Sequence, residues 1–141
     1  MYYNMGDLEA LDEPNSILNL EKAAPYLANP HYDLPLDIAL PIFSWGVLFR
    51  EGKMIKLLPG NGRQGMEEVT ESTYLDGYYL YAGDIIRWEA ITPDLLQAAC
   101  QQLRTLPKEG RHFITFYHLD EEMLAPFTAQ DLETCWKILV E

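Results

Sequence analysis

One long, nearly unbroken apolar run extends in this chain from Asp37 to Phe49. A strand with one face in water alternates apolar and polar residues, whereas a strand covered on both faces is apolar throughout, as in parallel sheets. Many residues of the run are β-branched or aromatic, which favours a pleated strand over a helix. Pro41 cannot donate a hydrogen bond to a neighbouring strand, so we expect a bend or bulge there. The run therefore predicts a central buried strand.

Two shorter stretches also predict strands, MYYNM at residues 1–5 and HFITFYH at residues 112–118. After the turn at Glu51-Gly52, residues 53–58 are expected to pair with residues 47–50 as a hairpin. The segment that follows shows no single helical or strand pattern. Residues 50–91 are therefore a long insertion after the central strand.

Three amphipathic stretches predict helices. Residues 92–94, Thr-Pro-Asp, combine a capping hydroxyl, a proline at the first helical position and an acid in the first turn. Thr128 with Asp131 three residues later forms a capping box that opens the last helix. Residues 15–28 predict a shorter helix, which Pro25 should kink because it removes one hydrogen bond.

The order of these elements, strands alternating with helices, predicts parallel βα units and a single α/β domain over residues 1–141. Three parallel strands leave two unpaired edges and cannot close a barrel. We therefore expect a partial (β/α)8, TIM-barrel-like fold: the last three βα units of a larger barrel, with a hairpin-containing insertion at about 50–91. The barrel would be truncated here or completed by another chain. Its unpaired edges would allow self-association.

Charge and composition restrict the partners. Ten basic and 22 acidic residues give a formal charge of −12, which disfavours nucleic acid and anionic membranes. No apolar stretch is long enough to span a membrane, and the first residues do not form a signal peptide, so export is expected only if a further N-terminal segment carries one. Cys100 and Cys135 fit buried thiols and have no metal-binding spacing. Localisation stays open.

Three segments, MYYNMG, LDIALPIFSWGVLFREGK and FITFYHLDEE, resemble in this order the C-terminal part of an uncharacterised bacterial family. That family is distantly similar to glycoside hydrolases of the chitinase type. Its sixth barrel strand carries a Met-x-Tyr pattern, matched by residues 1–3, and its seventh an apolar run into a proline and an aromatic, matched by residues 39–43. The eighth strand ends in an aromatic near an acid, matched by residues 116–118 and Asp120. The resemblance implies carbohydrate binding or glycan hydrolysis by the full-length protein. The catalytic Glu of the fourth strand would lie upstream of Met1, so no catalytic residue is expected in this chain.

Active sites of such barrels form at the C-terminal ends of the strands. An indole or a phenol can stack on a sugar ring, while Asn, His and Asp side chains can bind its hydroxyls. The alternative is that the aromatic side chains only complete the core and that the asparagine holds a turn. The candidate substrate-binding residues are Tyr3, Asn4, Ser44, Trp45, Tyr117, His118 and Asp120.

Other chemistry finds little support in the sequence. His118 and Asp120 would share one face of a strand and suggest a general base with its orienting carboxylate, yet no nucleophile pairs with them. No metal-ligand spacing and no phosphate-binding glycine loop occurs, so we expect no metal and no cofactor. Arg87 and Glu89 predict a structural ion pair. The alternative to a carbohydrate-binding protein is a small acidic module, of the inhibitor or immunity type, that binds a basic protein without catalysis.

Overall fold

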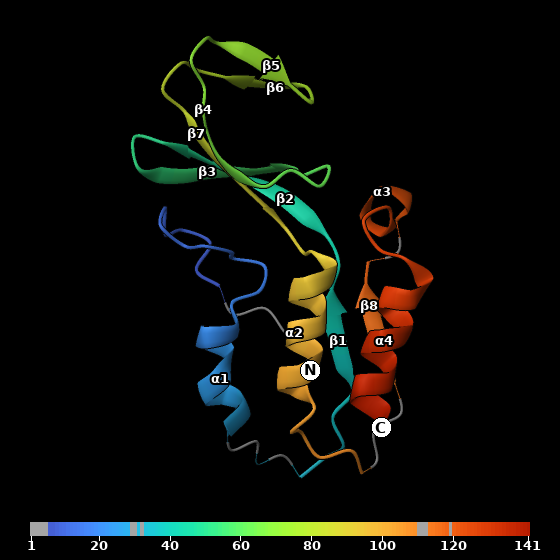
Figure 1. Ribbon diagram of the computed structural model, residues 1–141. Helices are drawn as coiled ribbons and strands as arrows, with labels where there is room; N and C mark the ends of the chain where they lie inside the picture. The colour runs from blue at the N-terminus through green and yellow to red at the C-terminus, as the bar shows by residue number, and fades with distance from the viewer. Residues whose placement is uncertain (1–5, 29–30, 32, 110–112, 119) are drawn as a thin grey trace.

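The computed structural model describes residues 6–28, 31, 33–109, 113–118 and 120–141. The molecule is elongated, with helices and one pair of strands at one end and antiparallel strands at the other (Figure 1). In chain order the elements are α1 (Leu20–Ala28), β1 (Ile38–Pro41), β2 (Ser44–Arg50), β3 (Lys53–Pro59), β4 (Gly65–Glu68), β5 (Thr73–Leu75), β6 (Tyr78–Leu80), β7 (Ile85–Ala90), α2 (Pro93–Leu103), β8 (Ile114–Tyr117), α3 (Glu121–Leu124) and α4 (Ala129–Val140).

The two long helices begin where their capping residues predict. The Thr92 hydroxyl accepts a hydrogen bond from the backbone N–H of Leu95 at 3.2 Å, which starts α2 at Pro93. Thr128 and Asp131 form the predicted reciprocal capping box at the start of α4. Both helix predictions are confirmed.

The first helix is shorter than predicted because two asparagines divide the segment. The Asn15 carboxamide oxygen accepts from the N–H groups of residues 17 and 18, which holds a turn. The Asn19 side chain then accepts from the N–H of Lys22 at 3.1 Å, and α1 begins at Leu20. Pro25 lies within the helix, as predicted.

The long apolar run forms two strands that belong to different sheets. β1 ends at Pro41, so the predicted interruption at that proline is confirmed, and residues 42–43 separate it from β2. β1 pairs in parallel with β8, Ile38 opposite Ile114 and Pro41 opposite Tyr117, which confirms their predicted parallel arrangement. β2 instead pairs antiparallel with both β3 and β7. A single continuous strand over residues 37–49 was therefore a wrong prediction.

This division overturns the expected partial (β/α)8 barrel. Among the described residues the sheets are mixed: one parallel pair, β1 and β8; one four-stranded antiparallel sheet in the order β3-β2-β7-β4; and one hairpin, β5 and β6. No repeating strand–helix order and no barrel closure occur in this part of the chain. The prediction failed because the residues beyond Pro41 find their backbone partners in antiparallel neighbours. The strand expected at residues 1–5 lies outside the described residues, and self-association through unpaired edges stays a prediction.

The antiparallel sheet contains the predicted hairpin. Val47 lies opposite Leu57, and the register shifts between Leu48 and Phe49. On the other side of β2, Gly46 lies opposite Trp88 of β7. A methyl group on Gly46 would come within 2.4 Å of the Trp88 ring, so glycine at this position allows the ring to pack closely against β2.

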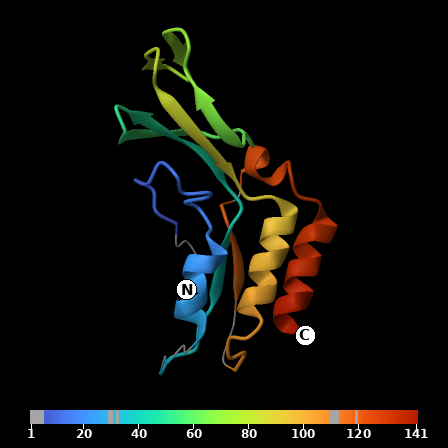
Figure 2. The same cartoon turned by 60° about the vertical axis from the view of Figure 1, so that its left-hand side comes forward.

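The described side chains form two hydrophobic cores. The helical region consists of α1, α2, α4, β1 and β8, whose aliphatic side chains pack together around Leu40, Leu96 and Leu139. The antiparallel lobe consists of β2 to β7, and its smaller core is formed by Leu48, Leu58, Val69, Leu80, Ile86 and Trp88. Turned by 60°, the molecule shows the long β2 and β7 strands leading from one region to the other (Figure 2).

Candidate functional site

Aromatic side chains gather where β1 and β8 end and β2 begins. Phe43 is the centre of this strand-end cluster, which consists of Phe43, Trp45, Tyr117 and His118. The Phe43 ring meets Trp45 edge-on at 5.1 Å and Tyr117 edge-on at 5.8 Å between centroids. It also stacks on the His118 ring at 6.4 Å. Tyr117 and His118 lie 5.1 Å apart. Three of the predicted site residues are therefore brought together.

The alternation of β8 decides which rings of this cluster reach the solvent. Ile114 and Phe116 pack against the core of the helical region, so Thr115 and Tyr117 point away from it. Tyr117 is 51% exposed, whereas Phe43 is buried beneath it. Trp45 and His118 are half-buried. The cluster therefore presents the phenol ring of Tyr117 on its surface, in edge-on contact with the buried phenyl ring of Phe43.

The indole of Trp45 is held by a buried carboxylate. Its Nε1–H donates to Glu89 Oε2 at 2.7 Å. Glu89 also accepts from Arg87 Nε at 2.7 Å, so the predicted ion pair is confirmed, and from the backbone N–H and hydroxyl of Ser16. Glu89 is buried, and its two oxygens together accept these four hydrogen bonds. This network fixes Trp45 relative to β7.

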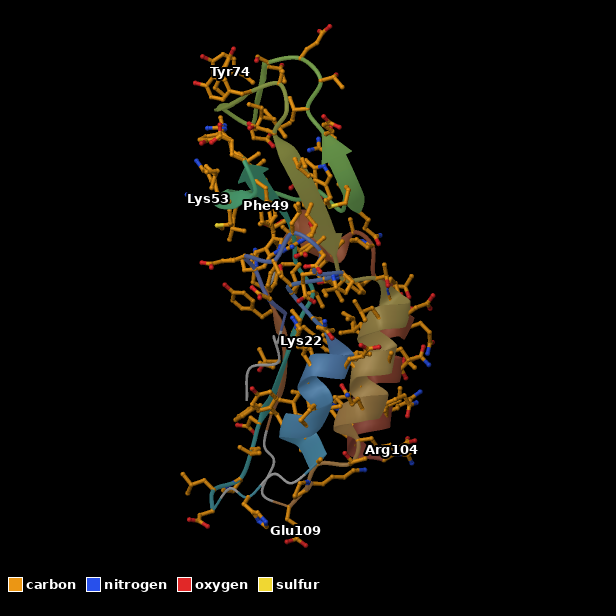
Figure 3. All side chains as sticks on the ribbon, turned by 90° about the vertical axis from the view of Figure 1, so that its left-hand side faces the viewer. Lys22, Phe49, Lys53, Tyr74, Arg104 and Glu109 are labelled. Atoms are coloured by element: carbon orange, nitrogen blue, oxygen red, sulfur yellow. The ribbon has the colours of Figure 1, made fainter. Side chains whose placement is uncertain are left out.

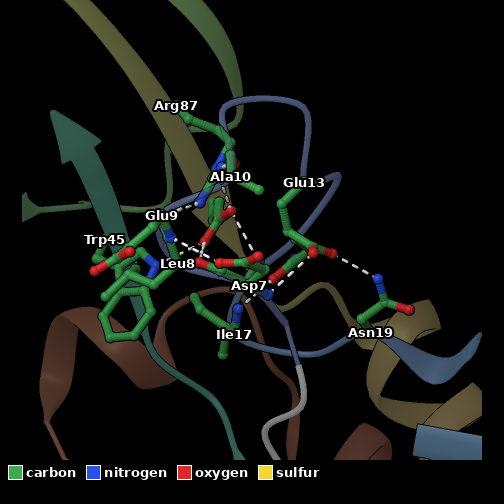
Figure 4. Close-up of polar contacts among 12 residues, drawn as sticks. Asp7, Leu8, Glu9, Ala10, Glu13, Ile17, Asn19, Trp45 and Arg87 are labelled. Atoms are coloured by element: carbon green, nitrogen blue, oxygen red, sulfur yellow. Dashed lines mark hydrogen bonds and ion pairs between the residues drawn. The ribbon is translucent and has the colours of Figure 1, made fainter. Parts of the chain in front are cut away.

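The same network fastens the segment before α1 to the sheet, as Figure 4 shows. The Arg87 guanidinium donates to the backbone carbonyls of Leu8 and Ala10. Nearby, Glu13 accepts hydrogen bonds from Lys22, from the Asn19 amide and from the Asp7 N–H. Burial alone would raise the pKa of Glu13, but these donors outweigh it and lower the pKa. Glu13 therefore remains a carboxylate that organises this segment.

Two predicted site residues have roles in the fold. Ser44 is buried, and its hydroxyl accepts from the N–H of Gly62 at 3.0 Å, which ties the loop between β3 and β4 to β2. Asp120 caps α3, accepting from the N–H of Glu122 at 2.8 Å. Because β8 ends at Tyr117, His118 and Asp120 do not share a strand face, and the expected common face was wrong. Tyr3 and Asn4 lie outside the described residues.

Cavities lie mostly away from the strand-end cluster. The cavity lined by Phe43, Ser44 and Met123 has a volume of only about 10 Å³, too small for a ligand. A larger, open one of about 550 Å³ lies in the antiparallel lobe beside Arg50, Tyr81 and Asp84. There the guanidinium of Arg50 donates twice to Asp84, each time at 2.8 Å.

Sequence reasoning missed three features of these sites. Phe43 was part of the apolar run but gave no sign that it would centre a cluster. Glu89 was expected to pair with Arg87, and its bond to Trp45, 44 positions away, has no local signal. The Arg50–Asp84 pair spans 34 positions and depends on the pairing of β2 with β7.

In the part of the chain that the structure describes, no helix is both long and apolar enough to cross a membrane, and no group of three or more potential ligands could hold a metal ion. Comparisons of the chain with known protein families, with curated proteins and with solved structures found no match. The resemblance to chitinase-type glycoside hydrolases therefore stays a prediction.

Proposed function

We propose that this protein binds a carbohydrate at the strand-end cluster, with the exposed ring of Tyr117 as the stacking surface. The observation that carries the proposal is the contact of four rings from two separate strand ends around Phe43. A phenol ring that is half in water and supported from below offers a flat, apolar surface to the C–H face of a sugar.

A polar side chain suited to binding sugar hydroxyls lies beside the Tyr117 ring. His118 lies beside Tyr117 and carries ring nitrogens that can donate or accept. Asp120, which caps α3, is exposed and follows His118 by two residues, and its carboxylate oxygens can accept hydrogen bonds. Within the cluster, Trp45 contacts Phe43. Its indole N–H already donates to Glu89, so Trp45 would contribute a ring face and not a donor.

The proposal is tested by titrating the protein with a chito-oligosaccharide and, separately, with a cello-oligosaccharide of equal length. The side-chain N–H resonance of Trp45 and the ring resonances of Tyr117 are followed by NMR. We expect both to move with one of the sugars, with a dissociation constant of about 1 mM, because an open surface orders a ligand weakly. Tyr117→Ala should weaken this binding about tenfold.

Tyr26→Ala is the matched control, because Tyr26 is a similarly exposed tyrosine on α1, 65% accessible. It should leave the titration unchanged. Resonances that stay in place with both sugars, or an equal loss of binding in the Tyr26 variant, would contradict carbohydrate binding at this cluster.

A further inference from the structure

The outward face of the β5–β6 hairpin carries tyrosines where polar side chains are expected. Tyr74 lies opposite Tyr79 in the hairpin register, and Tyr81 follows two residues later, so the three share one face. Successive rings are 4.9 Å apart between centroids, Tyr74 to Tyr79 and Tyr79 to Tyr81. Their exposed fractions are 71%, 37% and 52% in chain order. We call these three side chains the tyrosine row.

The fold itself does not require this row. The opposite face of the hairpin, with Leu75, Tyr78 and Leu80, packs on the core of the antiparallel lobe. An antiparallel hairpin that is covered on one side alternates apolar and polar residues, and its outer face is normally polar. Three adjacent exposed aromatic residues at the far end of the molecule, where Figure 3 labels Tyr74, therefore mark an interaction surface.

Two tyrosine rings of this hairpin already form cation–π contacts with basic side chains of the protein itself. The Arg50 guanidinium lies 4.5 Å from the centre of the Tyr81 ring, and the Lys56 ammonium lies 4.4 Å from that of Tyr78. Successive rings of the row are tilted by 73° and 77° to each other. They therefore form no common plane for the flat face of a glycan, but they present separate faces to single cationic groups.

The surroundings of the row carry the complementary charge. Residues 65–84 contain five carboxylates and no lysine or arginine. Tyr74 borders a groove of about 350 Å³ whose wall includes Glu68 and Glu71, with Leu75 and Leu80 as its apolar side. Among the described residues, no ion pair joins Glu68 or Glu71 to a basic side chain. Arg50 is the cation at the other end of the row, and Asp84 neutralises it.

We propose that the tyrosine row and its adjoining groove bind an arginine- or lysine-bearing segment of a partner protein. Aliphatic stems of the partner's basic side chains would lie against the tyrosine rings, while their charged ends meet Glu68 and Glu71 in the adjoining groove. The proposal is independent of the strand-end cluster, which lies on different elements. It commits to a cationic protein segment because both the ring geometry and the charge favour one.

The test uses the full chain and a fluorescein-labelled octapeptide of alternating arginine and glycine, followed by fluorescence anisotropy. A matched octapeptide with citrulline in place of arginine keeps the shape and removes the charge. We expect the arginine peptide to bind and the citrulline peptide to bind at least about tenfold more weakly. Added salt should weaken the arginine complex, because exposed charges are screened.

Two variants of the surface and one control locate the binding. Y74A/Y79A and E68Q/E71Q should each weaken the arginine peptide about tenfold, and circular dichroism should show an unchanged fold because these side chains are exposed. E21Q/E109Q removes the same charge from exposed positions outside the antiparallel lobe and should change binding less than twofold.

Several outcomes would overturn the proposal. One is wild-type affinity in Y74A/Y79A, and another is an equal loss in E21Q/E109Q, which would reveal attraction to the overall charge only. Displacement of the peptide by a chito-oligosaccharide would assign the rings to a sugar. A dimer in sedimentation equilibrium that Y74A/Y79A abolishes would assign the surface to a second copy of the chain.

Discussion

The helical region and the antiparallel lobe are built from the same chain by different means. In the helical region, 16 described hydrophobic side chains are buried in one core, whereas the core of the antiparallel lobe contains six, with Val47, Phe49 and Ala90 buried outside it. Burial of apolar area is the main source of stability in a folded domain. The antiparallel lobe must therefore rely more heavily on other contacts.

Those contacts are polar and aromatic, and they lie around the edges of the small core. Arg50 and Asp84 form a two-fold hydrogen-bonded ion pair, and the Trp88 indole donates to Glu67 at 2.6 Å. Arg63 lies over the Trp88 ring at 4.7 Å. In the helical region, the helix caps and the buried aliphatic faces of the helices supply the corresponding stabilisation. We infer that acid should disturb the antiparallel lobe first, and that loss of a cap should weaken the helical region alone.

Glu89 is the position where the two regions depend on each other, and its removal should have the largest effect. In Glu89→Ala the buried guanidinium of Arg87 loses its carboxylate, and the Trp45 and Ser16 donors lose their acceptor. We expect the free energy of unfolding to fall by about 3–5 kcal/mol in urea titrations followed by tryptophan emission. Both regions should unfold together. Glu21→Gln, at an exposed site, is the control, and a loss below about 1 kcal/mol in Glu89→Ala would contradict the linking role.

Asp84→Asn should have a smaller effect, confined to the antiparallel lobe. The hydrogen bonds from Arg50 hold the pKa of Asp84 below its ordinary value of 3.8, helped by the Tyr81 N–H. A carboxyl with a lowered pKa stabilises the fold above that ordinary value and loses its contribution as the pH falls through the folded-state pKa. At pH 7 the variant should lose about 2 kcal/mol, and the difference should shrink as the pH falls below 3.8.

Hydrogen exchange of the β6 and β7 amides measures this change, and the α2 amides supply the internal reference. Faster exchange in α2 than in β7 would show that the two regions are not separable in this way. A difference between wild type and variant that persists undiminished in acid would exclude the carboxylate as its source.

Thr128→Ala should have the smallest effect, on the helical region only. It removes the hydroxyl that accepts from the Asp131 N–H at 3.1 Å and so breaks the capping box of α4. We expect a loss of about 1 kcal/mol, seen as a lower midpoint of thermal unfolding. Thr70→Ala, at an exposed threonine of the antiparallel lobe, should stay within about 0.5 kcal/mol of wild type. Equal shifts in the two variants would contradict the capping argument.

The sequence predicted best what is decided locally. The starts of α2 and α4 depend on side chains that act within three residues of the helix end, so Thr92 and Thr128 identified them. The hairpin of β2 and β3 likewise follows from one turn at Glu51-Gly52. The shared edge at which β1 and β8 end was anticipated, because these two strands run in parallel.

What depends on distant partners was predicted poorly. Hydrophobicity alone did not reveal that residues 44–50 leave the sheet of β1 and pair with residues 85–90. Ser44 has the polarity of a ligand-binding residue, yet the loop at Gly62 engages its hydroxyl. The tyrosine row required the register of β5 and β6 before its members could be placed on one face.

The parallel pairing of β1 and β8 also determines the order in which the two regions can fold during synthesis. Ile38 lies opposite Ile114, 76 positions further along the chain. At about 5–20 residues per second, a ribosome would make β8 roughly 4–15 seconds after β1. During this interval the antiparallel lobe can complete its own pairings, because its strands all lie between the two. The β1 segment would meanwhile expose apolar side chains and unpaired backbone groups, which makes it the part of the nascent chain that a chaperone would bind first.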